Sequence, residues 1–287
     1  MKPIIIEDMP EEQYHAETGT GTGQFITRSM IHLAHKDPAL FDLRYNKKRP
    51  LAQFNGNVST DFGTYFESVL FDEMDNIIQV PDDHLTKSGA ISTKQDTVKW
   101  LEDRRAEGGV LETPAMKEKA AFMVERCMYS KKWQWLREKV KNPENRRQLV
   151  VRWQDRVTEL PLQVRIDIEI KGVCLIDIKT TMKALHSFST TASDYGYDIQ
   201  SVMYPHGYDL ATGEKLPFAF ATAQNKDPWE TDILQLSDAD LVYGDAHFGN
   251  GLKNIVEKNW YDENTKPTVV DSPAWKLYQH ENEEGGE

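Results

Sequence analysis

The sequence predicts an α/β fold in which helices flank a mixed central β-sheet. Residues 164–170 alternate apolar and polar side chains strictly, as expected of a half-exposed strand. Residues 173–176 have no polar face, as expected of a strand covered on both sides. Residues 115–140 repeat apolar positions at helical spacing, which indicates two helices beside the sheet. Further strands are expected at 149–153, 218–223 and 233–236, and further helices at 24–35, from 195 onward and at 238–260.

The charge balance excludes a protein that coats nucleic acid through many basic side chains. The chain has 287 residues and a formal net charge of −12, whereas general DNA-binding affinity rests on many Lys and Arg contacts to phosphate. Residues 117–147 nevertheless contain ten basic side chains and four acidic ones. This segment is either a localised basic surface that tracks one duplex or a solvated helix face of mixed charge.

We expect a flexible N-terminus at residues 1–20, a single domain at 21–275 with an irregular surface lobe at about 72–113, and an acidic tail at 276–287. No apolar run approaches the length of a membrane span. The first residues, MKPIIIEDMPEE, lack the apolar region of a signal peptide, so we expect a cytoplasmic protein. The two cysteines, Cys127 and Cys174, indicate neither a disulfide framework nor a zinc or iron–sulfur site.

The stretch from Asp167 to Lys179 contains the residue types of a metal-dependent phosphodiesterase. In a strand over residues 173–179, Asp177 and Lys179 point the same way, while Ile178 points into the core behind them. Divalent cations such as Mg²⁺ take oxygen ligands, which Asp167 and Asp177 can supply. A neighbouring lysine can hold or deprotonate the water that attacks the phosphate, and Lys179 is placed for this role.

These residues also form a pattern known from one superfamily of nucleases. Asp167, then Asp177-Ile178-Lys179, then Gln200 and Tyr204 on a later helix, resemble the signature of the PD-(D/E)xK nucleases. The Lys179-Thr180-Thr181 continuation and the upstream Phe62-Gly-Thr-Tyr-Phe-Glu67 are most similar to the RecE/RecB/lambda-exonuclease branch. Two departures are Ile166 in place of proline and Glu67 where RecE- and RecB-like members often have histidine.

The resemblance implies a fold, a set of site residues and a cofactor. The fold would be restriction-endonuclease-like, and the cofactor Mg²⁺, with Mn²⁺ as a substitute. Lys179, Asp167, Asp177 and Glu67 would be catalytic. The metal would be held at Glu67, Asp167, Asp177 and Ile178, and DNA would be bound by Arg28, Gln200 and Tyr204.

The function implied is that of a phage-type recombination exonuclease. Such an enzyme degrades one strand of linear double-stranded DNA, here in the 5′-to-3′ direction, and works with a single-strand-annealing recombinase. Relatives form rings around DNA, so a homo-oligomeric ring is expected. Two alternatives are a structure- or sequence-specific endonuclease on the same fold and a non-catalytic DNA-mimic or inhibitor module, which the net charge of −12 would suit.

The register of the strand pair decides whether the two aspartates can share one metal. A two-residue turn at Lys171-Gly172 would pair Ile170 with Val173 and place Asp167 and Asp177 on opposite faces of the sheet. A common site therefore requires an odd-numbered loop, a β-bulge or a kink between them.

Three local features lead to further expectations. Pro205 directly follows Tyr204, so the helix there should bend or stop. Residues 183–194 should form a polar loop. Gly63 lies inside a predicted helix, where glycine costs roughly 1 kcal/mol relative to alanine, so a close neighbour is expected beside it.

Overall fold

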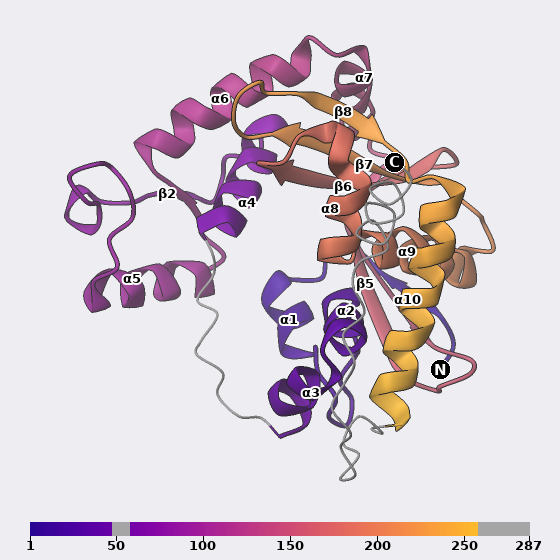
Figure 1. Cartoon of the computed structure of the whole chain (residues 1–287). Helices are drawn as coiled ribbons and strands as arrows, with labels where there is room; N and C mark the ends of the chain where they lie inside the picture. The colour runs from indigo at the N-terminus through magenta and orange to yellow at the C-terminus, as the bar shows by residue number, and fades with distance from the viewer. Residues whose placement is uncertain (48–57, 258–287) are drawn as a thin grey trace, which may run out of the picture.

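The computed structural model, which describes residues 1–47 and 58–257, is built around a mixed six-stranded β-sheet (Figure 1). The spatial order of the strands is β1-β4-β5-β6-β7-β8. Neighbouring strands are antiparallel except β6 and β7, which run parallel. The strands span Ile4–Ile6 (β1), Arg146–Gln154 (β4), Pro161–Ile170 (β5), Cys174–Thr181 (β6), Phe218–Gln224 (β7) and Thr231–Leu234 (β8). The predicted fold class is confirmed.

Helices cover both faces of this sheet and bury a hydrophobic core on each (Figure 1). One core, with Trp153 at its centre, lies under α2 and α9, and α10 packs on both of these helices. The other, with Trp133, lies under α4, α6 and α7. The helices span Arg28–Lys36 (α2), Val58–Leu70 (α4), Pro114–Met128 (α6), Lys131–Val140 (α7), Tyr197–Thr212 (α9) and Asp238–Glu257 (α10). The two helices predicted within residues 115–140 are α6 and α7.

Two regions predicted to lack regular structure contain it. The first twenty residues, predicted to be flexible, hold β1, which pairs with β4, and helix α1 (Glu11–Ala16). The lobe at 72–113 has a small core of its own around Leu101 and Leu111. Its elements are the parallel strands β2 (Ile77–Gln79) and β3 (Val110–Glu112), the 3₁₀ turn η2 (Asp82–His84) and α5 (Gln95–Ala106). Strands of three residues are too short to show an alternating pattern, which is why the sequence did not reveal them.

Short helices connect the larger elements. The π-helical turn η1 (Asp42–Asn46) follows α3 (Pro38–Phe41), and Phe41 is buried in the core under α2 and α9. Residues 183–194, predicted to be a loop, instead contain the 3₁₀ turn η3 (Leu185–Ser187) and most of α8 (Phe188–Tyr195). No helix within the described ranges is long and apolar enough to cross a membrane. The predicted acidic tail, residues 276–287, lies outside the described residues.

Helix α9 continues through Pro205, so of the two outcomes predicted there, a bend or a stop, the stop does not occur. Its inward face buries Tyr204 and Tyr208 against the sheet. A methyl group added at Gly207 would come within 2.4 Å of the Trp153 ring, so the helix backbone lies directly on the indole. This packing outweighs the one backbone hydrogen bond that proline removes.

The hairpin between β5 and β6 turns through three residues, Lys171 to Val173, and not through two. Ile170 pairs with Cys174, and Ile168 pairs with Ile176. Gly172 adopts a positive φ of 68°, a conformation that glycine takes without steric cost. One further step in the same register places Asp167 opposite Asp177. The odd-numbered loop, one of the three predicted solutions, is therefore the one that the chain uses.

Near Asp167, the side chains of strands β4 and β5 switch from one hydrophobic core to the other. Leu149 and Ile166 are paired and lie in the core under α9. Ile168 belongs instead to the core under α4, although only one residue separates it from Ile166. Gln148, on the neighbouring strand at this level, has a φ of 53°. The pair therefore twists sharply at the crossover where Asp167 lies, whereas the side chains of β6 alternate regularly between the two cores.

Candidate active site

Asp167, inside β5, links this strand to β6 through its side chain. The last backbone pair before it is Ile168 with Ile176, and beyond that point Asp167 Oδ2 accepts a hydrogen bond of 2.9 Å from the Ile178 main-chain N–H. The Ile178 side chain packs against the core under α4, so only its backbone belongs to the site. The hairpin thus fixes Asp167 beside the Asp177-Ile178-Lys179 segment.

Asp177 is held by one neighbour from the helical layer and one from its own strand. It is 3% exposed, and its Oδ1 accepts a hydrogen bond from Nε2 of Gln200, which is 1% exposed on α9. Its Oδ2 forms an ion pair with Lys179 but accepts no hydrogen bond from any described residue. A buried carboxylate oxygen with unused acceptor capacity is therefore available at this point.

Lys179 is set between carboxylates and an aromatic ring. Its Nζ lies 4.9 Å from the centre of the Tyr197 ring, and Arg28 Cζ lies 5.8 Å from the same ring. Burial lowers the pKa of Lys179, but the carboxylates of Asp177 and Asp167 outweigh it, and the net pKa is raised. The side chain therefore stays an ammonium, which favours holding the nucleophile over deprotonating it.

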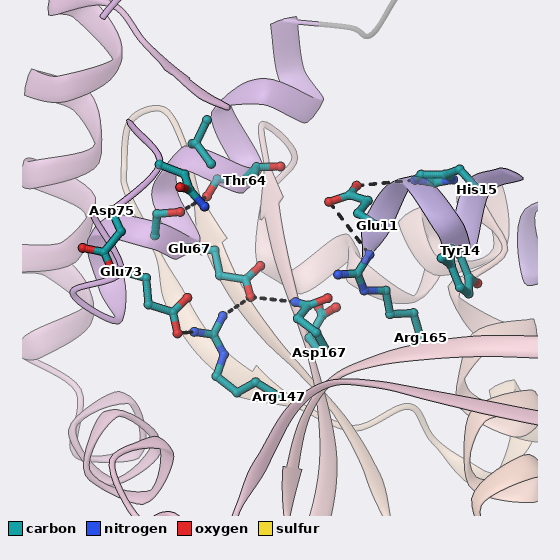
Figure 2. A pocket seen from close by; sticks show the side chains of 14 residues that line it. Glu11, Tyr14, His15, Thr64, Glu67, Glu73, Asp75, Arg147, Arg165 and Asp167 are labelled. Carbon is teal, nitrogen blue, oxygen red and sulfur yellow. Dashed lines mark hydrogen bonds and ion pairs between the residues drawn. The ribbon is translucent and has the colours of Figure 1, made fainter. Parts of the chain in front are cut away.

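Glu67 reaches the same region from α4 and lines an open cavity of about 540 Å³ (Figure 2). Its side chain is 18% exposed, forms an ion pair with Arg147 and accepts a 3.2 Å hydrogen bond from Gln148. Asp167 lines the same cavity. Burial raises the pKa of Glu67 although Arg147 lowers it, and the charges on Asp177 and Glu73 raise it further.

Comparisons with known proteins identify the family and the fold. A family described as "PDDEXK-like domain of unknown function (DUF3799)" matches residues 46–267. The chain belongs to this family. Its structure is also similar to a crystal structure from Eubacterium rectale described as a "Putative exonuclease", with 15% identity and a TM-score of 0.56, over 94% of this chain and 98% of that one. At that identity the likeness supports the fold. No curated protein matches the chain.

The carboxylates of Asp167, Asp177 and Glu67 repel one another, as expected where a cation would bind. Burial raises the pKa of Asp167 well above its usual range, and the charges on Asp177 and Glu67 raise it further. Carboxylate oxygens are the ligands that hard divalent cations prefer. As the side chains stand, however, no three acidic, histidine or cysteine residues in the described ranges are close enough together to hold one ion. The Glu67 carboxylate is instead engaged by Arg147 and Gln148.

Three predicted DNA-binding residues lie near this core, but two of them are buried. Gln200 supports Asp177, and Tyr204 is 7% exposed, with its ring edge-on to Phe218. Neither side chain offers a surface to DNA in this structure, because both are buried between α9 and the sheet. Arg28 is half-buried and donates a 2.6 Å hydrogen bond from Nη1 to the Tyr195 carbonyl oxygen.

The structure adds three residues that sequence reasoning missed. The Tyr197 ring lies beside the charged groups of both Lys179 and Arg28. Arg147 forms an ion pair with Glu67, and Arg165, two positions before Asp167, lines the cavity. Arg165 could have been suspected from its place on the predicted strand at 164–170. Arg147 lies just before the predicted strand at 149–153, because β4 begins earlier, at Arg146. Nothing in the local sequence marks Tyr197, because the tertiary packing of α9 on the sheet creates its contacts.

The basic segment at 117–147 is largely neutralised by acidic partners. Half of its ten basic side chains form ion pairs: Lys117, Lys132, Arg137, Arg146 and Arg147. The interpretation as a mixed-charge surface fits these contacts better than a continuous basic track. Lys119 differs from this group, since it forms no ion pair with any described residue and its pKa is lowered by burial.

Proposed function

We propose that the protein is a metal-dependent deoxyribonuclease that hydrolyses phosphodiester bonds. The observation that carries the proposal is the three-residue turn, whose register sets Asp167 beside the Asp177-Ile178-Lys179 segment: Asp167 accepts a hydrogen bond from the Ile178 N–H, and Lys179 forms an ion pair with Asp177. Carboxylates from two adjacent strands with an ammonium beside them are the groups this chemistry needs. A module that only mimicked DNA would have no use for a buried lysine at this point.

The residues fit a divalent cation, with Mg²⁺ as the expected ion and Mn²⁺ as a substitute. Asp167 and Asp177 would hold it, and Glu67 would join them on release from Arg147; the free acceptor capacity of Asp177 Oδ2 and the raised pKa of Asp167 support this set. A bound cation would offset negative charge and make its water more acidic. The Ile178 backbone, predicted at the metal, lies within this set through its N–H bond to Asp167.

The chain's own residues provide the remaining functions. Lys179, charged and fixed by Asp177, would hold the attacking water and stabilise charge that develops on the phosphate. Gln200 would keep the Asp177 carboxylate in one orientation. The guanidinium of Arg28, half-buried beside Tyr197, would bind a phosphate oxygen.

Within this class we propose an exonuclease that acts on linear double-stranded DNA in the 5′-to-3′ direction, with a single-strand-annealing recombinase as partner and a homo-oligomeric ring as the working form. The motif pattern of the RecE/RecB/lambda-exonuclease branch and the likeness to the Eubacterium rectale protein support the exonuclease. A structure- or sequence-specific endonuclease is the alternative.

One assay separates these possibilities. Linear duplexes with and without a 5′-phosphate, each labelled at one end, are incubated with Mg²⁺ beside a covalently closed circle. Stepwise loss from 5′ ends with an intact circle supports the exonuclease, and cutting of the circle supports the endonuclease. If neither substrate is cut with Mg²⁺ or Mn²⁺, the proposed deoxyribonuclease is wrong.

A further inference from the structure

A second cavity, of about 590 Å³, lies on the other side of α4 from the acidic one. Helix α4 separates the two, since Phe62 lines the second cavity and Thr64 lines the first. The floor of the second cavity is the end of β6, at Thr180 and Thr181, directly after Lys179. The cavity therefore begins where the catalytic strand ends.

Aromatic rings paired with lysines form two walls of this cavity. On the α6 side, Lys119 Nζ lies 4.7 Å from the centre of the Phe62 ring. On the α8 side, Lys183 Nζ lies 5.4 Å from the centre of the Tyr195 ring, which is 52% exposed. An exposed ring next to a cation suits a nucleobase stacked on the ring and a phosphate beside the cation.

Among the described residues no acidic side chain lines the second cavity, although the chain as a whole carries a net charge of −12. Asp194, outside the lining, forms a 2.9 Å ion pair with Lys183, which leaves Lys119 as the cation without a carboxylate partner among the described residues. Asn225, 9% exposed, contributes a buried amide oxygen that accepts no hydrogen bond from any described residue. A side-chain amide with unused hydrogen-bonding capacity can read the edge of a base. These features favour an anionic ligand that also carries flat polar rings.

Tyr197 connects this cavity to the catalytic lysine. Its ring lines the cavity and also lies 4.9 Å from Lys179 Nζ. The Tyr195 ring is stacked on it at a centroid distance of 5.8 Å and an interplanar angle of 25°. The hydrogen bond from Arg28 to the Tyr195 carbonyl fixes this pair. The two rings thus form a continuous aromatic ledge that runs from Lys179 to the surface.

From these observations we infer that the second cavity is a subsite for unpaired nucleotides, in which a base stacks on Tyr195 and the backbone passes Lys119 and Lys183. The inference rests on the proposed nuclease function and extends it, since it states that the strand beside the scissile phosphate is single-stranded at this point. Double-helical DNA would keep its bases stacked on one another and unavailable to the ledge.

Binding without cleavage tests this subsite. The full chain is titrated in EDTA with a single-stranded DNA of about eight nucleotides, within the usual range of site sizes, that carries one 2-aminopurine. Tyr195→Ala is expected to weaken binding roughly 5- to 100-fold and to remove the stacking-induced quenching. Tyr195→Phe should retain both. Tyr129→Ala is the matched control, because Tyr129 is 71% exposed and paired with Arg126 at 5.7 Å, outside the cavity.

Two further measurements separate stacking from charge. An oligonucleotide of the same length with abasic sites keeps the phosphates and loses the bases, so wild-type protein should bind it as weakly as Tyr195→Ala binds the intact strand. Lys119→Ala should reduce the slope of log K against log salt by roughly 0.7. Equal affinity for the abasic and intact strands, or equal losses in the Tyr195 and Tyr129 variants, would overturn the subsite. This assay measures binding without cleavage. If the protein binds as described but cuts no DNA, the nuclease proposal is wrong while the nucleotide subsite stands.

Discussion

The two cavities on either side of α4 have opposite chemistry. The lining of the first includes five carboxylates, those of Glu11, Glu67, Glu73, Asp75 and Asp167 (Figure 2). The lining of the second includes none and carries two lysines and two tyrosines. Asp177 and Lys179 lie on the strand between them, one contacting the other. In the proposed function, the carboxylates of the first cavity would bind the cation, and the lysines and tyrosines of the second would bind a nucleic acid strand.

This division explains how an acidic chain can act on an anion. Arg147 in the first cavity is paired with Glu67 and Glu73, so its charge serves the carboxylates around it. Of the two lysines that face the second cavity, Lys183 forms a 2.9 Å ion pair with Asp194, whereas Lys119 forms no ion pair with any described residue and is the cation available to a phosphate. Net charge is thus a poor guide to function here, because the local distribution decides which ligand each cavity accepts.

The largest expected effect is that of removing the ammonium between the cavities. Lys179→Ala should reduce DNA cleavage at least about a hundredfold, because a group that holds the nucleophile and stabilises developing charge is lost. Folding and Mg²⁺ binding should be nearly unchanged, since Lys179 does not bind the cation. Cleavage rates, melting temperature and calorimetric titration with Mg²⁺ measure the three quantities.

The matched control for that experiment is Lys171→Ala, in the exposed turn at the other end of the same hairpin. It should cleave at the wild-type rate. If Lys179→Ala retains more than about a tenth of wild-type activity, a loss smaller than general acid–base or electrostatic catalysis provides, its catalytic assignment is wrong.

A smaller effect is expected at Gln200, which acts through Asp177. Gln200→Leu removes the donor to Oδ1 and should reduce Mg²⁺ affinity or activity roughly 10- to 100-fold, as loss of a partner to a metal ligand usually does. Gln200→Glu should be worse at neutral pH, because it brings a second negative charge against Asp177. A readout specific to positioning is the Mg²⁺ dependence: excess cation should restore part of the activity of Gln200→Leu and none of that of Lys179→Ala.

How far the sequence predicted this site depends on the range of the interactions. The regular alternation of β6 made the shared direction of Asp177 and Lys179 predictable. Gln200 was singled out by the motif resemblance, which assigned it to DNA, whereas its hydrogen bond to Asp177 emerges only in the folded chain. The position of Asp167 was not predictable, because it depends on a three-residue turn and on a crossover at Gln148 that no periodic pattern encodes. The contacts of Tyr197 and Arg147 come from elements distant in the sequence, so only the assembled fold reveals them.

The next prediction tests the repulsion in the acidic cavity. The pKa of Asp167 is raised in the folded protein, chiefly by burial and then by Asp177 and Glu67. The contribution of neutral Asp167 to the stability of the fold is therefore fully present below about pH 3.9, the usual pKa of an aspartate in an unfolded chain. This contribution is lost as the pH rises through the higher pKa of Asp167 in the folded protein. Asp167→Asn stays neutral, so in EDTA its melting temperature should exceed that of the wild type near pH 7, with a gap that narrows as pH falls.

With Mg²⁺ in place of EDTA, the wild type should have the higher melting temperature near pH 7, because it gains free energy of cation binding that Asp167→Asn loses. Glu73→Gln is the control, because it also removes one negative charge from this cavity. Glu73 is exposed and forms an ion pair with Arg147. A melting-temperature gap for Asp167→Asn that does not change between about pH 4, near the reference pKa, and neutral pH would contradict the repulsion.

The smallest expected effect concerns the helix that separates the cavities. Gly63 was expected to mark a close approach of α4 to the catalytic strand, and its neighbour is indeed β6, at Thr180. The approach is not tight, however, because a Cβ at Gly63 would meet Thr180 Oγ1 at 3.8 Å, an ordinary contact. Gly63→Ala should therefore be tolerated and should stabilise the protein by about 0.5–1 kcal/mol through helix propensity.

Gly207→Ala is the matched opposite, because there a Cβ would lie 2.4 Å from the fully buried Trp153 ring. It should destabilise the fold by about 1–3 kcal/mol, the usual cost of overpacking a core. Urea denaturation of both variants measures the difference. If Gly63→Ala proved as destabilising as Gly207→Ala, α4 would have to lie closer to β6 than the structure places it, and the two cavities would not be separated as described. If Gly63→Ala stabilises the protein and leaves binding and cleavage unchanged, neither the packing of α4 on β6 nor the separation of the two cavities requires glycine at this position.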